Sequence, residues 1–232
     1  MVLTLDAVNI IQGSFEIAAD LTLQQGVKYA VIGPSGAGKS TMLNALCGFL
    51  PLAGGRLLWH GNEITELDPG ARPMTMLFQD NNLFPHLSVV QNVGLGLRPD
   101  LRLNDAQRAQ VDQALARVGL QSHGNKRPGA LSGGQQSRVA LARVLVQAQP
   151  ILLLDEPFAA LGPALRQDML ALLDDVVADT GAMLVMVTHA PEDVRRIADQ
   201  VLFVGGGKVA APQPAQALMD NPPPELRAYL GS

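Results

Sequence analysis

Residues 29–40 read YAVIGPSGAGKS, a short apolar run that leads into a glycine-rich loop. The loop, residues 33–40, fits the pattern G-x-x-x-x-G-K-[ST], and the apolar run before it predicts a buried strand. Glycines let backbone N–H groups converge on phosphate oxygens, and a helix that begins at the loop points its positive end at the same place. Lys39 can neutralise the β- and γ-phosphates, and the Ser40 hydroxyl can bind Mg²⁺. The stretch therefore predicts a phosphate-binding loop between a strand and a helix.

Helical spacing continues behind this loop, where Met42, Leu43, Leu46 and Phe49 recur on one face. Pro51 and the two glycines that follow it end the pattern. We expect a helix over this stretch, extending as far as Phe49.

The remaining apolar residues follow two patterns that are typical of strands. Alternation with polar neighbours predicts short, half-exposed strands near the N-terminus, at Leu3, Leu5, Ile17, Leu21 and Leu23. The uninterrupted apolar run at 151–154 predicts a strand covered on both faces, as in a parallel sheet, and the runs at 183–187 and 201–204 predict further strands. Helical patterns separate these runs, so we expect an α/β fold with its ligand site at the carboxyl ends of the strands.

The stretch from residue 85 to about 129 differs, because it has few β-branched runs and contains one clear helix pattern. Asn104 can cap that helix, with Gln107 three residues on, and Gly119 can end it. We predict a single domain with a catalytic core at about 1–84 and 150–210, a helical subdomain at about 85–149, and a peripheral C-terminal tail at 211–232.

Composition narrows the class of protein. Hydrophobic residues make up 47% and charged residues 16% of the 232 residues, which predicts a folded chain. The 17 basic and 21 acidic residues give a net charge of −4, which disfavours nucleic acid as a partner. We identify no secretory signal and no apolar run long enough to span a membrane. The single cysteine, Cys47, is interpreted as a core residue in a reducing compartment.

Two carboxylates, Asp155 and Glu156, follow the apolar run 151–154. At the carboxyl end of a parallel strand, Asp155 would suit a Mg²⁺ shell, and Glu156 would suit polarising an attacking water. The alternative is a solvated acidic turn.

The stretch LSGGQ, residues 131–135, comes about twenty residues earlier. A serine and two glycines at the start of a helix present N–H groups and a hydroxyl at its positive end. This pattern predicts either a second anion site or an ordinary helix cap.

Taken with Gln79 in MLFQD and His189 in VTHA, these motifs resemble those of ABC-type ATPases in order and spacing over nearly the whole chain. The resemblance implies a P-loop NTPase sheet with an N-terminal antiparallel β subdomain and an inserted helical subdomain. It implies ATP and Mg²⁺ as ligands, with the metal held by Ser40, Gln79 and Asp155, and with Glu156, His189 and Gln79 as catalytic residues. The implied ATP-binding residues are Gly33, Pro34, Ser35, Gly36, Ala37, Gly38, Lys39, Ser40 and Thr41.

The resemblance also implies a head-to-tail homodimer in which the LSGGQ residues of one copy cover the ATP held by Lys39 of the other. Gln79 would connect the site to an integral membrane permease, so the chain would be peripheral on the cytoplasmic face of the bacterial inner membrane. The implied signature residues are Leu131, Ser132, Gly133, Gly134 and Gln135.

The segment 76–104 is similar to the same stretch of the ATP-binding subunits of bacterial thiamine importers. This similarity implies thiamine, with thiamine phosphate as a further cargo, as the transported substrate. A periplasmic thiamine-binding protein would then act through the permease. The alternatives are another small-molecule importer, a soluble ABC ATPase outside transport, and a nucleotide-dependent binding module without turnover.

Two positions depart from the family pattern. Residues 159–162 read AALG, with Gly162 where the family usually has aspartate, and we expect retained ATP binding with altered coupling or turnover. Residues 8–13 lack an aromatic that could stack on adenine, and Phe15 is the nearest candidate. His60, His86 and His123 belong to no motif and are interpreted as structural or solvated.

Overall fold

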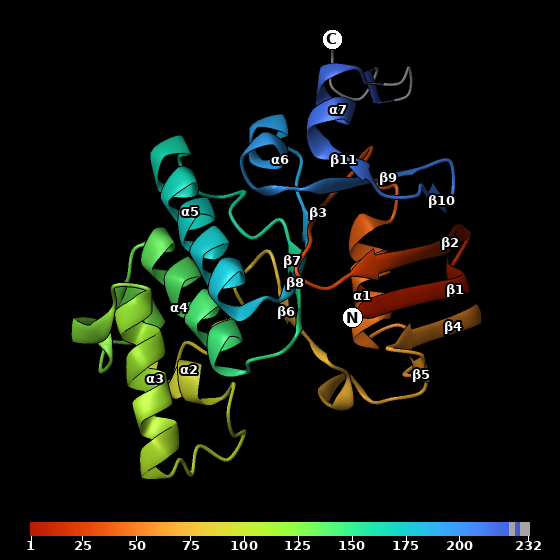
Figure 1. Cartoon of the computed structure of the whole chain (residues 1–232). Helices are drawn as coiled ribbons and strands as arrows, with labels where there is room; N and C mark the ends of the chain where they lie inside the picture. Colours follow the sequence, from red (N-terminus) through yellow and green to blue (C-terminus); the bar gives the residue numbers. More distant parts are fainter. Residues whose placement is uncertain (223–225, 228–232) are drawn as a thin grey trace. The chain divides into compact units, whose positions relative to one another are not determined.

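The computed structural model describes residues 1–222 and 226–227. Residue contacts divide the chain into two compact units (Figure 1). The first unit consists of Met1–Met74, Pro150–Asp155 and Gly181–Ser232, and the second of Thr75–Gln149 and Glu156–Thr180. The second unit contains the predicted helical subdomain, residues 85–149, and also includes residues on either side of it. The subdomain boundaries given from the sequence remain a prediction.

The first unit begins with antiparallel strands. Strand β1 pairs with β2 on one side and with β4 on the other, and β5 pairs with β4. Along β2 buried and exposed residues alternate, because one face of the strand packs on the core. The predicted half-exposed strands near the N-terminus, β1 and β2, are therefore confirmed. The bounds of the antiparallel strands are β1 Val2–Gln12, β2 Phe15–Gln24, β4 Gly54–Trp59 and β5 Asn62–Glu63.

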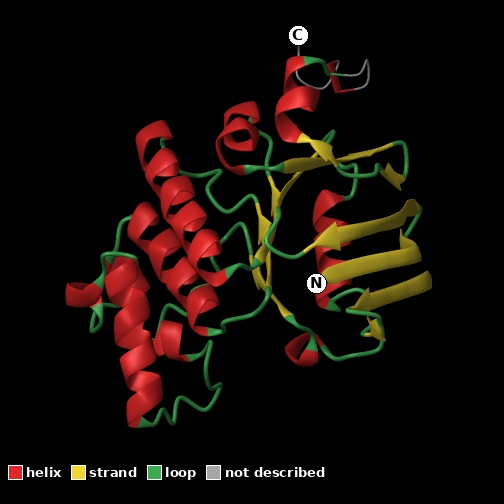
Figure 2. Ribbon diagram, in the orientation of Figure 1, coloured by secondary structure: helices red, strands yellow, loops and turns green. Residues whose placement is uncertain are grey.

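Parallel strands continue the same sheet in the order β9, β3, β8, β7 (Figure 2). Residues 183–187 are all buried, as expected for a strand covered on both faces. Because the strands are parallel, the loops after β3, β7 and β8 leave from the same edge of the sheet. The bounds are β3 Lys28–Ile32, β7 Ile151–Asp155, β8 Met183–Val187, β9 Gln200–Gly205, β10 Lys208–Val209 and β11 Gln213–Pro214.

Helix α1 (Lys39–Cys47) starts at the end of the glycine-rich loop and stops earlier than the sequence predicts. Gly48 adopts a left-handed φ of 85°, and its N–H donates to the carbonyl of Ala45, so the chain turns away from the helix axis. Phe49, at which the spacing predicts helix, therefore lies beyond the end of α1 and is 55% exposed. Cys47 is buried as predicted, and its burial raises the pKa of the thiol to about 12.

The C-terminal segment of the first unit is more deeply packed than the sequence suggests. Ala215, Leu218 and Met219 of α7 are buried in a cluster with Ala30 and Ile32 of strand β3. The prediction of a peripheral tail is therefore wrong for this helix, whereas Pro223 and Pro224 lie outside the described residues. The other helical elements here are the 3₁₀ helix η1 Pro69–Ala71, α6 Pro191–Ile197 and α7 Ala215–Asp220.

The second unit is helical apart from strand β6 (Met74–Leu77), which starts at the last residue of the first unit. Its core contains Val93, Val111, Leu115 and Val139, from three helices. The predicted helix after Asn104 is confirmed with its cap, because the Gln107 N–H donates to the Asn104 side chain and the Gln107 amide oxygen accepts from the Asn104 N–H. The elements are α2 Val89–Gly94, α3 Asp105–Arg117, η2 Gln121–His123, η3 Pro128–Ala130, α4 Gly133–Val146 and α5 Pro163–Thr180.

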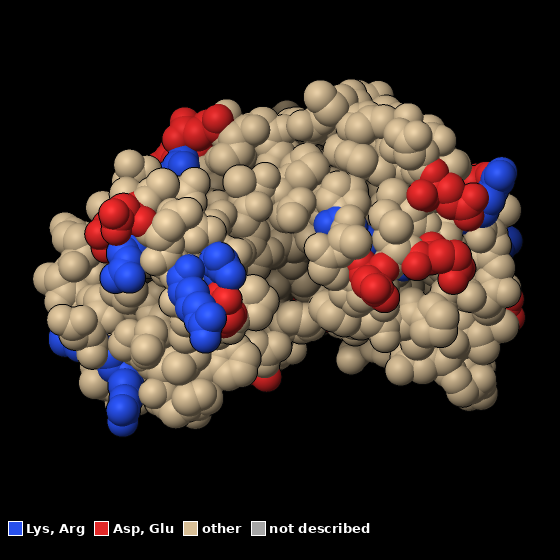
Figure 3. All heavy atoms as spheres, turned by 90° about the horizontal axis from the view of Figure 1, so that it is seen from below, with Lys and Arg blue, Asp and Glu red and all other residues tan. Residues whose placement is uncertain are grey.

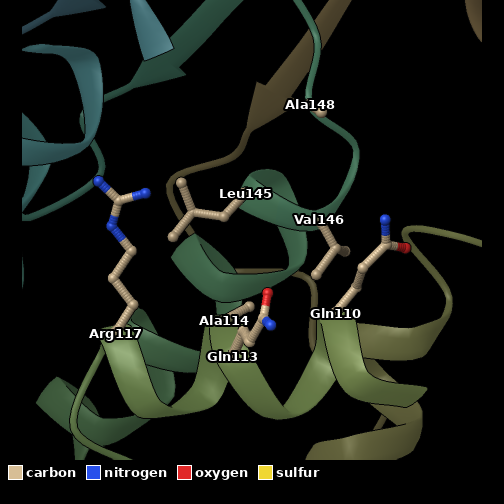
Figure 4. A pocket seen from close by; sticks show the side chains of 7 residues that line it. All are labelled: Gln110, Gln113, Ala114, Arg117, Leu145, Val146 and Ala148. Carbon is tan, nitrogen blue, oxygen red and sulfur yellow. The ribbon is translucent and has the colours of Figure 1, made fainter. Parts of the chain in front are cut away.

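A groove of about 210 Å³ lies between α3 and the end of α4 (Figure 4). Gln110, Gln113 and Arg117 line it from α3, and Leu145 and Val146 from α4. None of the predicted ATP-binding or signature residues lines this groove.

The surface carries isolated ion pairs. On the face drawn in Figure 3, basic and acidic side chains lie interspersed. Arg98 pairs with Asp100 at 2.7 Å and Arg195 with Asp220 at 2.8 Å, and the side chains of both pairs are about half exposed. Pairs this exposed add little to stability. Among the described residues, no helix is both long enough and apolar enough to cross a membrane.

The buried guanidinium group of Arg72 binds the carbonyl groups at the C-terminal end of α1. Arg72 is 5% exposed, and its Nε donates to the carbonyl of Leu67 at 3.0 Å. Its terminal nitrogens donate to the carbonyls of Ala45 (2.9 Å), Leu46 and Thr65 (2.6 Å). Burial lowers the pKa of Arg72, while the negative end of the helix favours a cation at this place. The side chain therefore ties the helix behind the glycine-rich loop to the segment that leads into β6.

We expect Arg72→Met to lower the free energy of unfolding by about 2–4 kcal/mol, because four carbonyl groups lose a charged donor. Urea denaturation followed by circular dichroism measures this loss. Arg56→Met is the matched control, because Arg56 pairs with Asp6 at the surface, and it should leave the transition unchanged. Equal losses in the two variants would contradict the role assigned to Arg72.

Candidate functional site

The loop of residues 33–40 connects β3 to α1 within the first unit, as predicted. Gly33, Gly36 and Gly38 have φ values of 152°, 76° and 93°, a region that residues with a Cβ rarely adopt. A Cβ on Gly33 would lie 2.0 Å from the carbonyl oxygen of Val204, so side chains are excluded there by contact as well as by conformation. The glycines of the motif are therefore required by the shape of the loop.

Lys39 folds back over this loop. The residue is 5% exposed, and its ammonium group donates to the carbonyl oxygens of Gly33 at 2.8 Å and Pro34 at 2.9 Å. The loop thus holds a cation among its own backbone groups. An anion that enters the loop can take over these hydrogen bonds, and it would meet the positive end of α1 at the same point.

Ser40 and Asp155 are brought together although 115 residues separate them in the sequence. The Ser40 hydroxyl donates to a carboxylate oxygen of Asp155 at 3.0 Å. Asp155 is the last residue of β7, and Ser40 lies in the first turn of α1, so the sheet itself positions both. A hydroxyl and a carboxylate side by side are hard oxygen donors of the kind that Mg²⁺ prefers.

An aromatic ring lies against the loop. A Cβ on Gly38 would come within 2.4 Å of Cε1 of Phe15 and within 2.2 Å of Cδ1 of Ile17, so these two side chains cover that glycine. Phe15 starts β2 and stays partly exposed. Next to it, the Thr41 hydroxyl donates to the side chain of Gln12 at 3.2 Å.

His189 leaves the sheet at the same edge as the loop, directly after β8. It is exposed, whereas its neighbour Thr188 is buried and donates to Asp193 at 2.8 Å. The Ala190 N–H donates to the Thr188 hydroxyl at 3.1 Å. The turn that carries His189 is therefore held by its neighbours, while the imidazole faces outward.

Two of the predicted catalytic residues belong to the second unit. Glu156 has a φ of 47°, a left-handed conformation that costs a non-glycine residue roughly 1–3 kcal/mol and that often occurs at functional sites. Gln79 is exposed in the turn that follows β6.

The LSGGQ residues form the start of α4 in the second unit. Ser132 is the N-cap, its Oγ accepts from the Gln135 N–H at 3.3 Å, and the Gln135 side-chain oxygen accepts from the Ser132 N–H at 3.0 Å. Leu131 is buried in the helical core, and a Cβ on Gly134 would lie 2.2 Å from Leu165. Gly133 is exposed. The predicted helix start is confirmed, and it takes the form of a capping box.

One neighbour of this motif has no signal in the sequence. Nε2 of His123 lies 3.4 Å from Nε2 of Gln135. No spacing rule connects a loop residue to a helix residue twelve positions later, so sequence reasoning assigned His123 to no site.

The chain is similar to known proteins over nearly its whole length. Residues 18–159 match the family described as ABC transporter. The thiamine import ATP-binding protein ThiQ of Cereibacter sphaeroides is 57% identical over 229 residues, which cover 99% of each chain. The protein of the same name from Ruegeria sp. is 54% identical over 230 residues, covering 99% of this chain and 100% of its own.

The fold is also found among solved structures. An ATP-binding cassette of an ABC transporter, in its ADP conformation, has a TM-score of 0.86 at 21% identity and covers 100% of this chain and 99% of its own. The glycine-rich loop, the Ser40–Asp155 pair and the LSGGQ helix start all lie inside the matched region. The predicted fold class is confirmed, and the chain belongs to the ABC transporter family, with the fold of that family's ATP-binding cassettes.

Proposed function

We propose that this chain is the ATP-hydrolysing subunit of a bacterial importer of thiamine. The observation that carries the chemistry is the arrangement at one sheet edge, where Lys39 lies over the glycine-rich loop and Ser40 is bonded to Asp155. The assignment of thiamine as the cargo rests on relatives named as thiamine import ATP-binding proteins. These relatives are 57% and 54% identical over almost the full chain.

The residues present suit ATP with Mg²⁺. Backbone N–H groups of residues 33–40 and the Lys39 ammonium would hold the phosphates, and Ser40, Asp155 and Gln79 would hold the metal. The metal would supply neutralisation of phosphate charge. Glu156 would accept the proton of the attacking water, and His189 would contact the γ-phosphate.

The second half of the site would come from another copy of the chain. In such a homodimer, residues 131–135 of one copy would cover the ATP held by the other. Supporting this, the capping box leaves the exposed Gly133 at the positive end of a 14-residue helix, where an anion is favoured. The site within one copy has no use for a second anion-binding helix end.

An importer must move its cargo across the membrane, which requires partner proteins besides this chain. An integral membrane permease would bind the chain on the cytoplasmic face of the inner membrane, and a periplasmic thiamine-binding protein would deliver the cargo to the permease. Substrate selection then belongs to those two proteins, and no residue described here is assigned a contact with thiamine.

The function is tested in a strain whose gene for this chain has been deleted. The chain is supplied in trans, and the uptake of labelled thiamine is measured. We expect uptake to be restored by the parent chain and to be lost with Glu156→Gln, whose ATP hydrolysis should fall by about 10²–10⁴. Restored uptake of a different labelled solute, with none of thiamine, would support another importer. ATP hydrolysis without any membrane partner in copurification would instead point to a soluble ABC ATPase.

The ring of Phe15 is proposed to stack on adenine, because it is partly exposed beside Gly38. We expect Phe15→Ala to raise the Kd for ATP about two- to tenfold, with Phe15→Trp close to the parent chain. Titration with a fluorescent ATP analogue measures both. Phe84→Ala removes an exposed ring in the other unit and serves as the control. An unchanged Kd for Phe15→Ala would exclude the ring from the site.

Gly162 precedes α5, and its carbonyl accepts from the Arg166 N–H at 2.9 Å, which is an N-cap geometry. A Cβ there would meet no described atom within 4 Å, so aspartate is sterically accepted. We expect Gly162→Asp to leave the Kd for ATP unchanged and to raise ATP turnover about two- to tenfold, through contacts across the dimer. Gly162→Ala controls for the backbone change. Equal rates in the aspartate variant and the parent chain would reject a role for this position in turnover.

A further inference from the structure

Three helices of the second unit begin with the same arrangement, a polar N-cap and a glutamine at the third helical position. These capping boxes are Ser88 with Gln91, Asn104 with Gln107, and Ser132 with Gln135. Among the hydrogen bonds of the described residues, the amide nitrogen of Gln135 has a partner outside its box, the His123 ring. No such bond is found for the amide nitrogens of Gln91 and Gln107 in the same part of the chain. The helix start that carries LSGGQ therefore has an additional support.

The capping box sets which end of the Gln135 amide faces His123. Its oxygen accepts from the Ser132 N–H at 3.0 Å, so its nitrogen points away from the cap and toward the ring, 3.4 Å from Nε2. An amide nitrogen has only hydrogens to offer, so Nε2 of His123 must supply the lone pair. The proton of the neutral ring then sits on Nδ1, 3.1 Å from the Ser122 hydroxyl, which can accept it. Both ring nitrogens have partners in this tautomer.

Hydrogen bonds hold the backbone of the loop that carries His123. His123 ends η2, and its carbonyl accepts from the Lys126 N–H at 2.9 Å. The loop that follows is bonded to the first turn of α2, where the N–H groups of Val89 and Val90 donate to Lys126 O (2.8 Å) and Gly124 O (3.0 Å). These bonds satisfy N–H groups that a helix start would otherwise leave without partners. The loop is thus attached to α2, and the acceptor that it presents to α4 is held in place.

We propose that His123 is a positioning residue for the signature motif. Its ring orients the Gln135 amide, the amide holds the Ser132 backbone, and the Ser132 hydroxyl and the following N–H groups keep the geometry needed to cover a nucleotide on a second copy. This inference rests on the proposed function, in which residues 131–135 act across a homodimer. His123 itself touches no nucleotide in this arrangement, so its effect is on dimer closure and not on the first binding of ATP.

A hydrogen bond and simple packing predict different results at this position. His123→Leu keeps an apolar side chain of moderate size and removes the acceptor. His123→Gln keeps an acceptor oxygen within reach of the Gln135 amide. If the ring only fills space, the effect of each variant on dimerisation should depend on how well its side chain fills the same volume. If the ring acts as an acceptor, His123→Gln should keep the dimerisation that His123→Leu impairs.

The experiment measures ATP-driven dimerisation in the Glu156→Gln background, where the ATP-bound state persists because hydrolysis is blocked. Sedimentation gives the ATP concentration for half-maximal dimerisation, and a fluorescent ATP analogue gives the Kd of the monomer. We expect His123→Leu to raise the half-maximal concentration about two- to tenfold with an unchanged monomer Kd, and His123→Gln to stay within about twofold of the parent chain. Gln107→Leu, which disrupts the equivalent box of α3, is the matched control and should have no effect.

Thermal unfolding of each variant establishes that it is folded before dimerisation is compared. Unchanged dimerisation in His123→Leu would overturn the proposal, and so would an equal defect in His123→Gln. A parent chain that binds ATP but never dimerises would overturn the proposed function and, with it, this inference. The proposal is supported if the parent chain and Gln107→Leu dimerise at similar ATP concentrations and the folded His123→Leu variant needs a higher concentration.

Discussion

The hydrogen bond from Ser40 to Asp155 is the contact on which the rest of the site depends. It joins the helix after the glycine-rich loop to the end of a strand more than a hundred residues away, and it forms at the edge where parallel strands end. Lys39 lies over the loop beside it, and His189 leaves the next strand at the same edge. In the proposed site, a phosphate group with its Mg²⁺ would therefore meet a cation, a hydroxyl and a carboxylate at positions set by the sheet. Arg72 supports this arrangement from the far end of α1, where it donates to the carbonyls of Ala45 and Leu46 in the last turn.

In the second unit the main local feature is the capping of helix N-termini. Three of its helices, α2, α3 and α4, are capped by side chains three residues apart, which satisfies backbone donors without long-range contacts. At α4 this local device gains a distant partner, because the loop bonded to α2 places His123 against Gln135. In the proposed homodimer this helix end would act on another molecule, which requires a fixed orientation. A capping box by itself holds only the first turn, and the contact with His123 connects that turn to the rest of the unit.

Much of the fold could be predicted because its signals are local. The alternating strands, the buried parallel strands and the capped helix after Asn104 all depend on residues a few positions apart, and all are confirmed. The length of α1 was predicted wrongly, since Phe49 continues the apolar spacing while Gly48 ends the helix in a left-handed conformation. The C-terminal helix packs in a core cluster with residues of β3, although the sequence predicts a peripheral tail, because its short apolar pattern does not reveal that Leu218 joins this cluster.

The sequence by itself determined the phosphate-binding loop, the acidic pair, the signature helix start and the family, because each is a short string whose backbone geometry follows from its own residues. The tertiary structure decided which of these strings meet. Asp155 next to Ser40, Phe15 against Gly38, and Arg72 at the end of α1 each join positions that no periodicity connects. His123 shows the difference most clearly, since its acceptor has meaning only once a loop and a helix are packed together. Hydrogen bonds act over about 3 Å in space, whereas sequence patterns record only distance along the chain.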